Sequence, residues 1–187
     1  SWDEARFESC GQKWMDMSEG HYGVSLLNDC KYGHSALDGV MTLTLIKSGI
    51  EPNPTADQEE HTFTYALYPH AEGWRRANTV QEAMKLNQPL LSEEGGQAGC
   101  QNSFVWVDKS NVIIETVKMA EDDDGIIVRL YESENAKTKA HIFFGEKISS
   151  VESCNCLEEI KQTIETDGEG FEITVKPYEI QTYRVRF

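Results

Sequence analysis

The sequence has little positive charge and no long apolar run. Its 17 Lys and Arg residues stand against 32 Asp and Glu residues, which gives a net charge of −15 at pH 7. A chain with this balance is a poor partner for a nucleic-acid backbone or an anionic lipid surface. No apolar stretch approaches the roughly 20 residues that a membrane-spanning helix needs, so the sequence predicts no contact with a membrane.

Cysteine and histidine are present, but not in the patterns of disulfide frameworks or metal sites. The five cysteines are Cys10, Cys30, Cys100, Cys154 and Cys156. Their odd number, the absence of a CxxC pair and the absence of a signal-peptide pattern favour a reducing, cytoplasmic location. The five histidines show neither HxxxH nor HExxH spacing, so the sequence predicts no metal site and no cofactor site in this chain.

The common catalytic motifs are absent as well. The sequence contains no GxSxG nucleophile elbow, no GxxxxGK[ST] phosphate loop and no GxGxxG after a predicted strand. A pair of carboxylates can hydrolyse a glycoside, but among 32 acidic residues chance alone brings some pair to the required separation. The sequence therefore assigns no catalytic residue.

The main structural signal is an alternation of apolar and polar residues, which predicts β-strands. The stretches that show it are 24–27, 41–45, 61–68, 104–107, 112–117, 126–131, 141–144, 171–175 and 183–187. In 61–68 the alternation places Phe63, Tyr65 and Leu67 on one face, which we expect to be the buried face. Strands at this spacing, joined by Gly, Asp and Asn turns, are typical of a sandwich and not of βαβ units.

One short helix and one domain boundary are expected. Thr79 to Glu82 matches a capping box and opens an apolar pattern with helical spacing, so we predict a helix near 79–88. The glycine-rich stretch after it predicts a linker at 89–103. The fold class is all-β: an antiparallel, supersandwich-like β-sandwich portion over 1–88 and a smaller β-sandwich over 104–187.

Aromatic and polar residues cluster in the first half of the chain. Exposed Trp and Tyr rings beside Asn, Asp and His side chains would suit a sugar, because rings pack on C–H surfaces and polar groups bond hydroxyls. The same residues equally fit a sandwich core and a hairpin turn. From the residues alone the core and turn interpretation is favoured.

Several segments of the sequence resemble the C-terminal region of family 38 α-mannosidases. The segments are 22–33 (YGVSLLNDCKYG), 38–45, 57–74, the opening 1–8 and the ending 175–184. This resemblance implies an all-β C-terminal portion of a larger enzyme, in which an N-terminal catalytic domain precedes it. Family members are retaining, zinc-dependent exo-mannosidases of mannose metabolism, and their catalytic and metal-binding residues belong to the N-terminal domain. None of those residues is carried over to this chain.

The resemblance also implies roles for particular residues and partners. Related β-regions pack on the catalytic domain and lend loops to its pocket, so Asn28, Asp29, Lys31 and Tyr32 are predicted at the rim of a site for a mannose-containing glycan. A turn that only stabilises the sandwich is the alternative. The residues predicted to pack against another domain are Tyr68, His70 and Trp74. A stand-alone carbohydrate-binding module, a purely structural domain and a homo-oligomer remain open alternatives.

Overall fold

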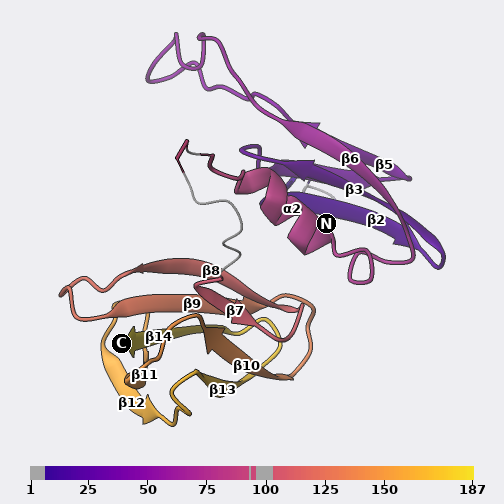
Figure 1. Ribbon diagram of the computed structural model, residues 1–187. Coiled ribbons are helices and arrows are strands. Elements are labelled where there is room, and N and C mark those ends of the chain that lie inside the picture. The colour runs from indigo at the N-terminus through magenta and orange to yellow at the C-terminus, as the bar shows by residue number, and fades with distance from the viewer. Residues whose placement is uncertain (1–6, 93, 96–102) are drawn as a thin grey trace. The chain divides into compact units, whose positions relative to one another are not determined.

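The computed structural model describes residues 7–92, 94–95 and 103–187, and it divides the chain into two compact units. Unit 1 is Ser1–Glu94 and unit 2 is Gly95–Phe187. The division falls inside the predicted linker, of which residue 93 and residues 96–102 lie outside the described residues. Both units are built mainly from antiparallel strands, so the predicted all-β fold is confirmed (Figure 1).

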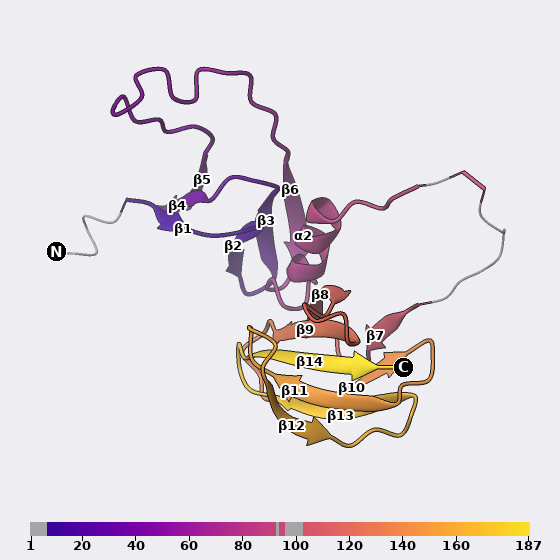
Figure 2. The same ribbon diagram turned by 90° about the vertical axis from the view of Figure 1, so that its left-hand side faces the viewer.

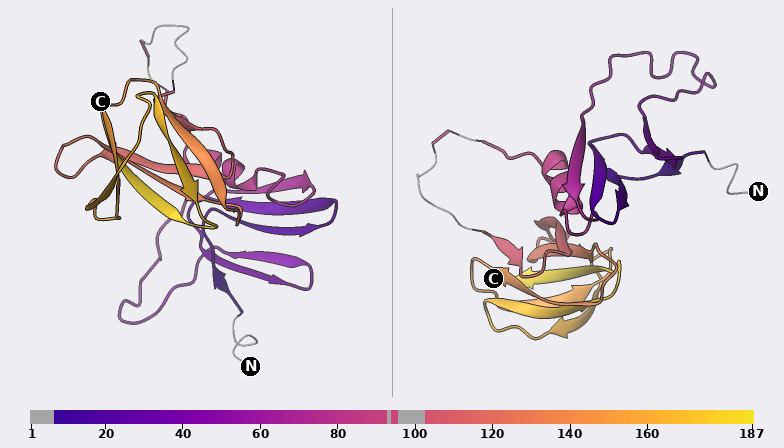
Figure 3. Two further views of the ribbon diagram at one scale, coloured as in Figure 1. Left: turned by 90° about the horizontal axis from the view of Figure 1, so that it is seen from below. Right: turned by 90° about the vertical axis from the view of Figure 1, so that its right-hand side faces the viewer.

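The described residues of unit 1 form two small antiparallel sheets and the helix α2 (Thr79–Asn87). The strands are β1 (Ser9–Cys10), β2 (Trp14–Glu19), β3 (Tyr22–Asn28), β4 (Gly33–Leu37), β5 (Val40–Thr44) and β6 (Tyr65–Ala71). One sheet has the order β2-β3-β6 and the other the order β1-β4-β5. The connection 45–64 forms neither strand nor helix and projects away from both sheets (Figures 2 and 3).

The predicted helix is α2 (Thr79–Asn87), which packs against β2 and β3 (Figure 2). Its buried residues are Thr79, Val80 and Ala83. The capping-box prediction differs from the structure in detail. Asn78 is the N-cap, in the left-handed region, and makes no side-chain cap bond. The Thr79 hydroxyl lies 2.8 Å from that of Ser25 on β3, so it joins helix and sheet instead of capping.

Unit 2 is a sandwich of a five-stranded and a three-stranded sheet. Its strands are β7 (Val105–Val107), β8 (Val112–Met119), β9 (Ile126–Glu132), β10 (Thr138–Phe144), β11 (Ser150–Cys154), β12 (Ile160–Ile164), β13 (Gly170–Val175) and β14 (Ile180–Arg186). The sheet orders are β12-β11-β14-β9-β8 and β13-β10-β7. The inner faces of both sheets supply one continuous apolar core, which includes Leu130, Ile142 and Phe171.

The face of β6 that the sequence marks as buried is exposed. Tyr65 is 58% exposed and Leu67 is 67% exposed. The opposite face of the strand, with Tyr68 and His70, is the one that packs inside unit 1. The alternation itself is correct, but the described residues of unit 1 leave this apolar face uncovered.

Candidate functional site

Asn28, at the end of β3, is fully buried and ties three segments together. Its side-chain oxygen accepts a hydrogen bond of 2.8 Å from the backbone N–H of Lys31. Its amide nitrogen lies 3.2 Å from Nε2 of His34, whose Nδ1 lies 3.1 Å from the carbonyl of Tyr32. A neutral His34 with its proton on Nδ1 satisfies both bonds at once. The carbonyl of Asn28 accepts a bond of 3.0 Å from the amide of Asn87 on α2.

Asp29 pairs with the backbone just before β6. Its carboxylate accepts a bond of 2.9 Å from the N–H of Thr64, and its own N–H donates to the Thr64 carbonyl at 3.1 Å. Hydrogen bonds from the Cys30 thiol and from Thr64 lower the pKa of Asp29. The same carboxylate raises the pKa of Cys30, which disfavours its reactive thiolate. The start of the 28–33 loop is thus tied to the segment that precedes β6.

Of the four residues of the predicted rim, Tyr32 is the one that is exposed, and Lys31 is half-buried. Tyr32 is 51% exposed, and the ammonium of Lys31 lies 4.8 Å from the ring centroid of Phe63. A Cβ at Gly33 would overlap the carboxylate of Glu8, so glycine allows the close approach there. Asn28 and Asp29 therefore position the loop, while Lys31 and Tyr32 present chemical groups. Contact with substrate stays a prediction for all four.

Tyr68, His70 and Trp74 have partners inside unit 1. The hydroxyl of Tyr68 donates to the Ala77 carbonyl at 3.0 Å, and the rings of Trp74 and Trp14 lie 5.0 Å apart. A Cβ at Gly23 would overlap the ring of His70, so that ring lies directly on β3. The expected packing against another domain stays a prediction for these three, whereas Tyr65 and Leu67 are exposed large apolar side chains of the strand.

A serine, a histidine and an aspartate, the residue types of a hydrolytic triad, lie together beneath α2. Their hydrogen bonds do not follow the order of a catalytic triad. Asp16 accepts hydrogen bonds of 2.7 Å from the Ser25 hydroxyl and from Nε2 of His70. In a catalytic triad the histidine bonds the nucleophile, and the carboxylate orients the histidine from its other side. Here the carboxylate stands between the two, so the arrangement is a buried structural network that joins β2, β3 and β6.

No metal centre is found in the parts of the chain that the structure describes. Within those ranges, no three His, Cys, Asp or Glu side chains gather closely enough to hold a metal ion. The described residues therefore do not fit the zinc that the resemblance implies for the larger enzyme.

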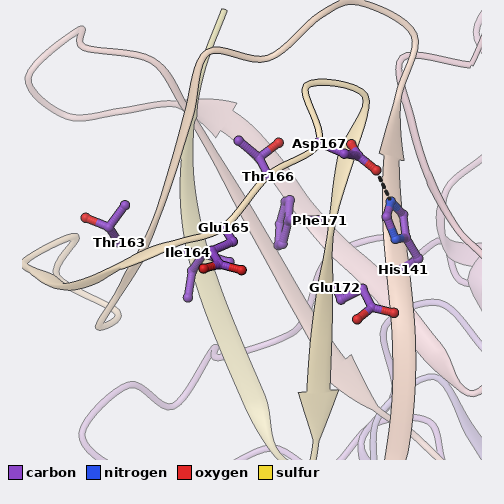
Figure 4. Close-up of a pocket in the computed structure, with 8 residues that line it drawn as sticks. All are labelled: His141, Thr163, Ile164, Glu165, Thr166, Asp167, Phe171 and Glu172. Atoms are coloured by element: carbon purple, nitrogen blue, oxygen red, sulfur yellow. Dashed lines mark ion pairs between the residues drawn. The ribbon is translucent and has the colours of Figure 1, made fainter.

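Unit 2 carries an open cavity of about 540 Å³. The sequence predicts no site residue there. Figure 4 shows the eight residues that line it, with His141 on β10 directed towards Asp167. The His141 Nε2 atom and the Asp167 carboxylate are 3.7 Å apart, too far for a hydrogen bond. A Cβ at Gly170 would overlap the Ile142 carbonyl, so the backbone at the start of β13 lies close against β10.

Comparison with known proteins identifies both units. A model of the glycosyl hydrolases family 38 C-terminal domain matches residues 1–55, and one of the family 38 C-terminal β-sandwich domain matches residues 111–183. Alpha-mannosidase G of Dictyostelium discoideum is 36% identical over 98% of this chain and 18% of its own length. Alpha-mannosidase 2C1 of Homo sapiens is 37% identical over 84% of this chain and 16% of its own length.

A solved structure shows the same fold. An alpha-mannosidase from Enterococcus faecalis V583 matches with a TM-score of 0.72 and 22% identity over 95% of this chain and 21% of that chain. The chain thus spans about a fifth of that structure and less than a fifth of the two curated relatives. The resemblance drawn from the motifs is confirmed, and the chain belongs to the C-terminal region of glycosyl hydrolase family 38.

Proposed function

We propose that this chain is the accessory β-rich portion of a larger, retaining, metal-dependent α-mannosidase that hydrolyses terminal α-mannosides of glycans. The names of its relatives and their greater length support the proposal. The chain itself performs no catalysis in this proposal. It packs on the catalytic part of the protein and presents Lys31 and Tyr32 near the pocket rim.

The observation that carries the proposal is the uncovered face of β6. Leu67 pairs in register with Leu26 of β3, so the exposed side chain lies on the apolar side of the sheet. Tyr65 extends the same face. Burial stabilises a folded protein by roughly 25 cal/mol for each Å² of apolar surface removed from water. Exposed large apolar side chains do not contribute this stabilisation. A sheet face of this kind is typical of a surface that another domain covers.

A second observation in unit 1 agrees with this. An open cavity of about 460 Å³ lies between the β2–β3 hairpin and β5. Met17, Tyr22, Val24 and Met41 line it and give it an apolar wall. Among the described residues, the buried apolar side chains of unit 1 are Leu26, Leu27, Val80 and Ala83, a small core for this length of chain. Burial of the cavity wall by the rest of a larger protein would complete that core.

The proposal includes a cytoplasmic location. The four described cysteines, Cys10, Cys30, Cys154 and Cys156, are free thiols, which suits a reducing compartment. Where the structure describes the chain, no helix combines the length and the hydrophobicity that crossing a bilayer requires. The metal belongs to the catalytic part of the protein in this proposal.

An activity assay tests the proposal. The purified 187-residue chain is expected to release no aryl group from an aryl α-mannoside above a no-protein control, while the larger protein that contains it does. Turnover by the 187-residue chain would contradict the accessory role. An inactive larger protein, assayed with added zinc, cobalt and manganese, would contradict the mannosidase assignment.

A further inference from the structure

The outer face of the three-stranded sheet in unit 2 carries a stack of rings. Trp106 on β7 and Phe143 on β10 are directly paired, and their rings stack with centroids 5.4 Å apart and planes within 11°. His141, two residues before Phe143 and so on the same face, lies 4.3 Å from the Phe143 ring. Trp106 is 41% exposed and belongs to an edge strand. We call Trp106, Phe143 and His141 the ring platform.

The ring platform is held from behind by the core. The residues that alternate with it on β10, Ala140, Ile142 and Phe144, are buried in the interior of the sandwich. Such a sheet has few ways to rearrange, so the rings are presented in a fixed geometry. A preformed aromatic surface loses little conformational entropy when a ligand binds to it.

Carboxylates flank the ring platform where it meets the cavity of Figure 4. Glu172 of β13 pairs in register with His141, and the Asp167 carboxylate lies near the imidazole. Bonds from the N–H groups of Glu169 and Gly170 lower the pKa of Asp167, so it stays ionised at neutral pH. One of its oxygens takes both bonds, which leaves the other as an acceptor.

This combination selects the chemistry of the ligand. The C–H face of one sugar ring packs on an aromatic side chain, and the hydroxyls of a neighbouring sugar donate to the carboxylates at the His141 end of the ring platform. An anionic ligand would meet Asp167, Glu172 and the net charge of −15. A purely apolar partner would remove those carboxylates from water without forming hydrogen bonds to them, which is energetically unfavourable. A neutral, hydroxyl-rich ligand meets neither penalty.

We propose that the ring platform and the adjoining cavity form a non-catalytic binding surface for a neutral glycan of at least two hexose residues. Trp106 on β7 supplies the stacking face for one sugar residue, and Asp167 and Glu172, on the other side of β10, accept hydroxyl hydrogen bonds from a neighbouring residue. The surface belongs to unit 2 alone and uses none of the residues of the 28–33 loop. It goes beyond the proposed function, because the surface would hold glycan whether or not the larger protein hydrolyses it.

Titration of the 187-residue chain tests the surface. Methyl α-D-mannopyranoside and an α-linked mannotriose are added up to about 50 mM, since contact with one or two sugar rings gives millimolar affinity. The indole N–H resonance of Trp106, assigned by its loss in Trp106→Ala, is expected to shift. The affinity of Trp106→Ala, followed by amide resonances, is expected to fall about tenfold. No shift at the highest concentration, or equal affinity in the variant, would overturn the proposal.

If Trp106→Ala does not fold, two further variants still test the proposal. Glu172 is exposed and ion-paired with Lys139, so Glu172→Gln is expected to fold normally and to weaken binding. Tyr178, an exposed ring elsewhere in unit 2, is the matched control, and Tyr178→Ala should bind as the parent chain does. Equal loss in Glu172→Gln and Tyr178→Ala would overturn the proposal.

A last measurement separates glycan binding from domain packing. Hydroxyl-radical labelling of Trp106 is compared between the 187-residue chain and the larger protein. The proposal expects similar labelling in both and protection by mannotriose. Protection of Trp106 in the larger protein without sugar would make the ring platform a domain interface and overturn the proposal. This test and the mannosidase assay can fail separately, because sugar binding is measured in the 187-residue chain, which is expected to have no activity.

Discussion

Replacing Glu132 by Ala is expected to lower the free energy of unfolding of unit 2 by about 3–5 kcal/mol, because it leaves several buried hydrogen-bond donors without their acceptor. Glu132 is fully buried at the end of β9. One oxygen accepts bonds from the Asn111 amide at 2.9 Å and the Glu134 N–H at 2.7 Å, and the other accepts from the Tyr178 N–H at 3.0 Å. Without the carboxylate, three segments lose their common acceptor.

Urea unfolding of the 187-residue chain, followed by hydrogen exchange in β9 and β14, measures the effect. Glu146→Ala, a change at an exposed acidic residue of unit 2, is the control and should shift the midpoint very little. A loss below about 1 kcal/mol in Glu132→Ala, the size of an ordinary exposed interaction, would contradict the assigned role.

The dependence of this effect on pH follows from the carboxylate. Burial acts to raise the pKa of Glu132, but hydrogen bonds from Tyr178, Asn111 and Glu134 outweigh it and hold the pKa below its ordinary value of 4.5. A lowered pKa in the folded state contributes stability that is complete above that value and is lost as the pH falls towards the folded pKa. The difference between the parent chain and Glu132→Gln is therefore expected to shrink below pH 4.5. A difference that grows with acid would contradict the role of the ionised form.

Asn28→Ala is expected to destabilise unit 1 by about 2 kcal/mol, because it leaves the Lys31 N–H and the His34 ring without their partner in a buried place. Thermal unfolding of the 187-residue chain measures this, with Tyr32→Ala as the control, since that side chain is largely exposed. In the larger protein, Tyr32→Ala is expected to raise KM while the melting temperature stays nearly unchanged. A normal melting temperature with a raised KM in Asn28→Ala would instead place Asn28 itself at the substrate.

Much of the fold can be predicted from the sequence because its strands alternate clearly, but the alternation predicts no strand at β1, β2, β4, β11 or β12. β2 was missed because Asp16 occupies its buried face, where it bonds Ser25 and His70. β12 was missed because it is an exposed edge strand with almost no buried side. β6 begins four residues later than predicted and continues through Pro69, which an edge strand tolerates because its N–H is not needed for pairing.

The sites were less accessible, because they depend on contacts between distant segments. The turn-forming character of Asn28 and Asp29 is visible in the sequence, but the partners His34 and Asn87 are not. The sequence does not predict the ring platform, although it predicts the two strands that carry it. Alternation places Trp106 outwards on one strand and Phe143 outwards on the other, but only the register of β7 on β10 brings the two rings together.

The uncovered face of β6 gives the most direct test of the accessory role. Hydroxyl-radical labelling of Tyr65 and Leu67 is compared between the 187-residue chain and the larger protein, with Tyr178 of unit 2 as an internal reference for exposure. Strong labelling of both residues in the isolated chain and clear protection in the larger protein is the predicted result. Equal labelling of Tyr65 and Leu67 in the two proteins would contradict the claim that this chain is a domain completed by the rest of the enzyme.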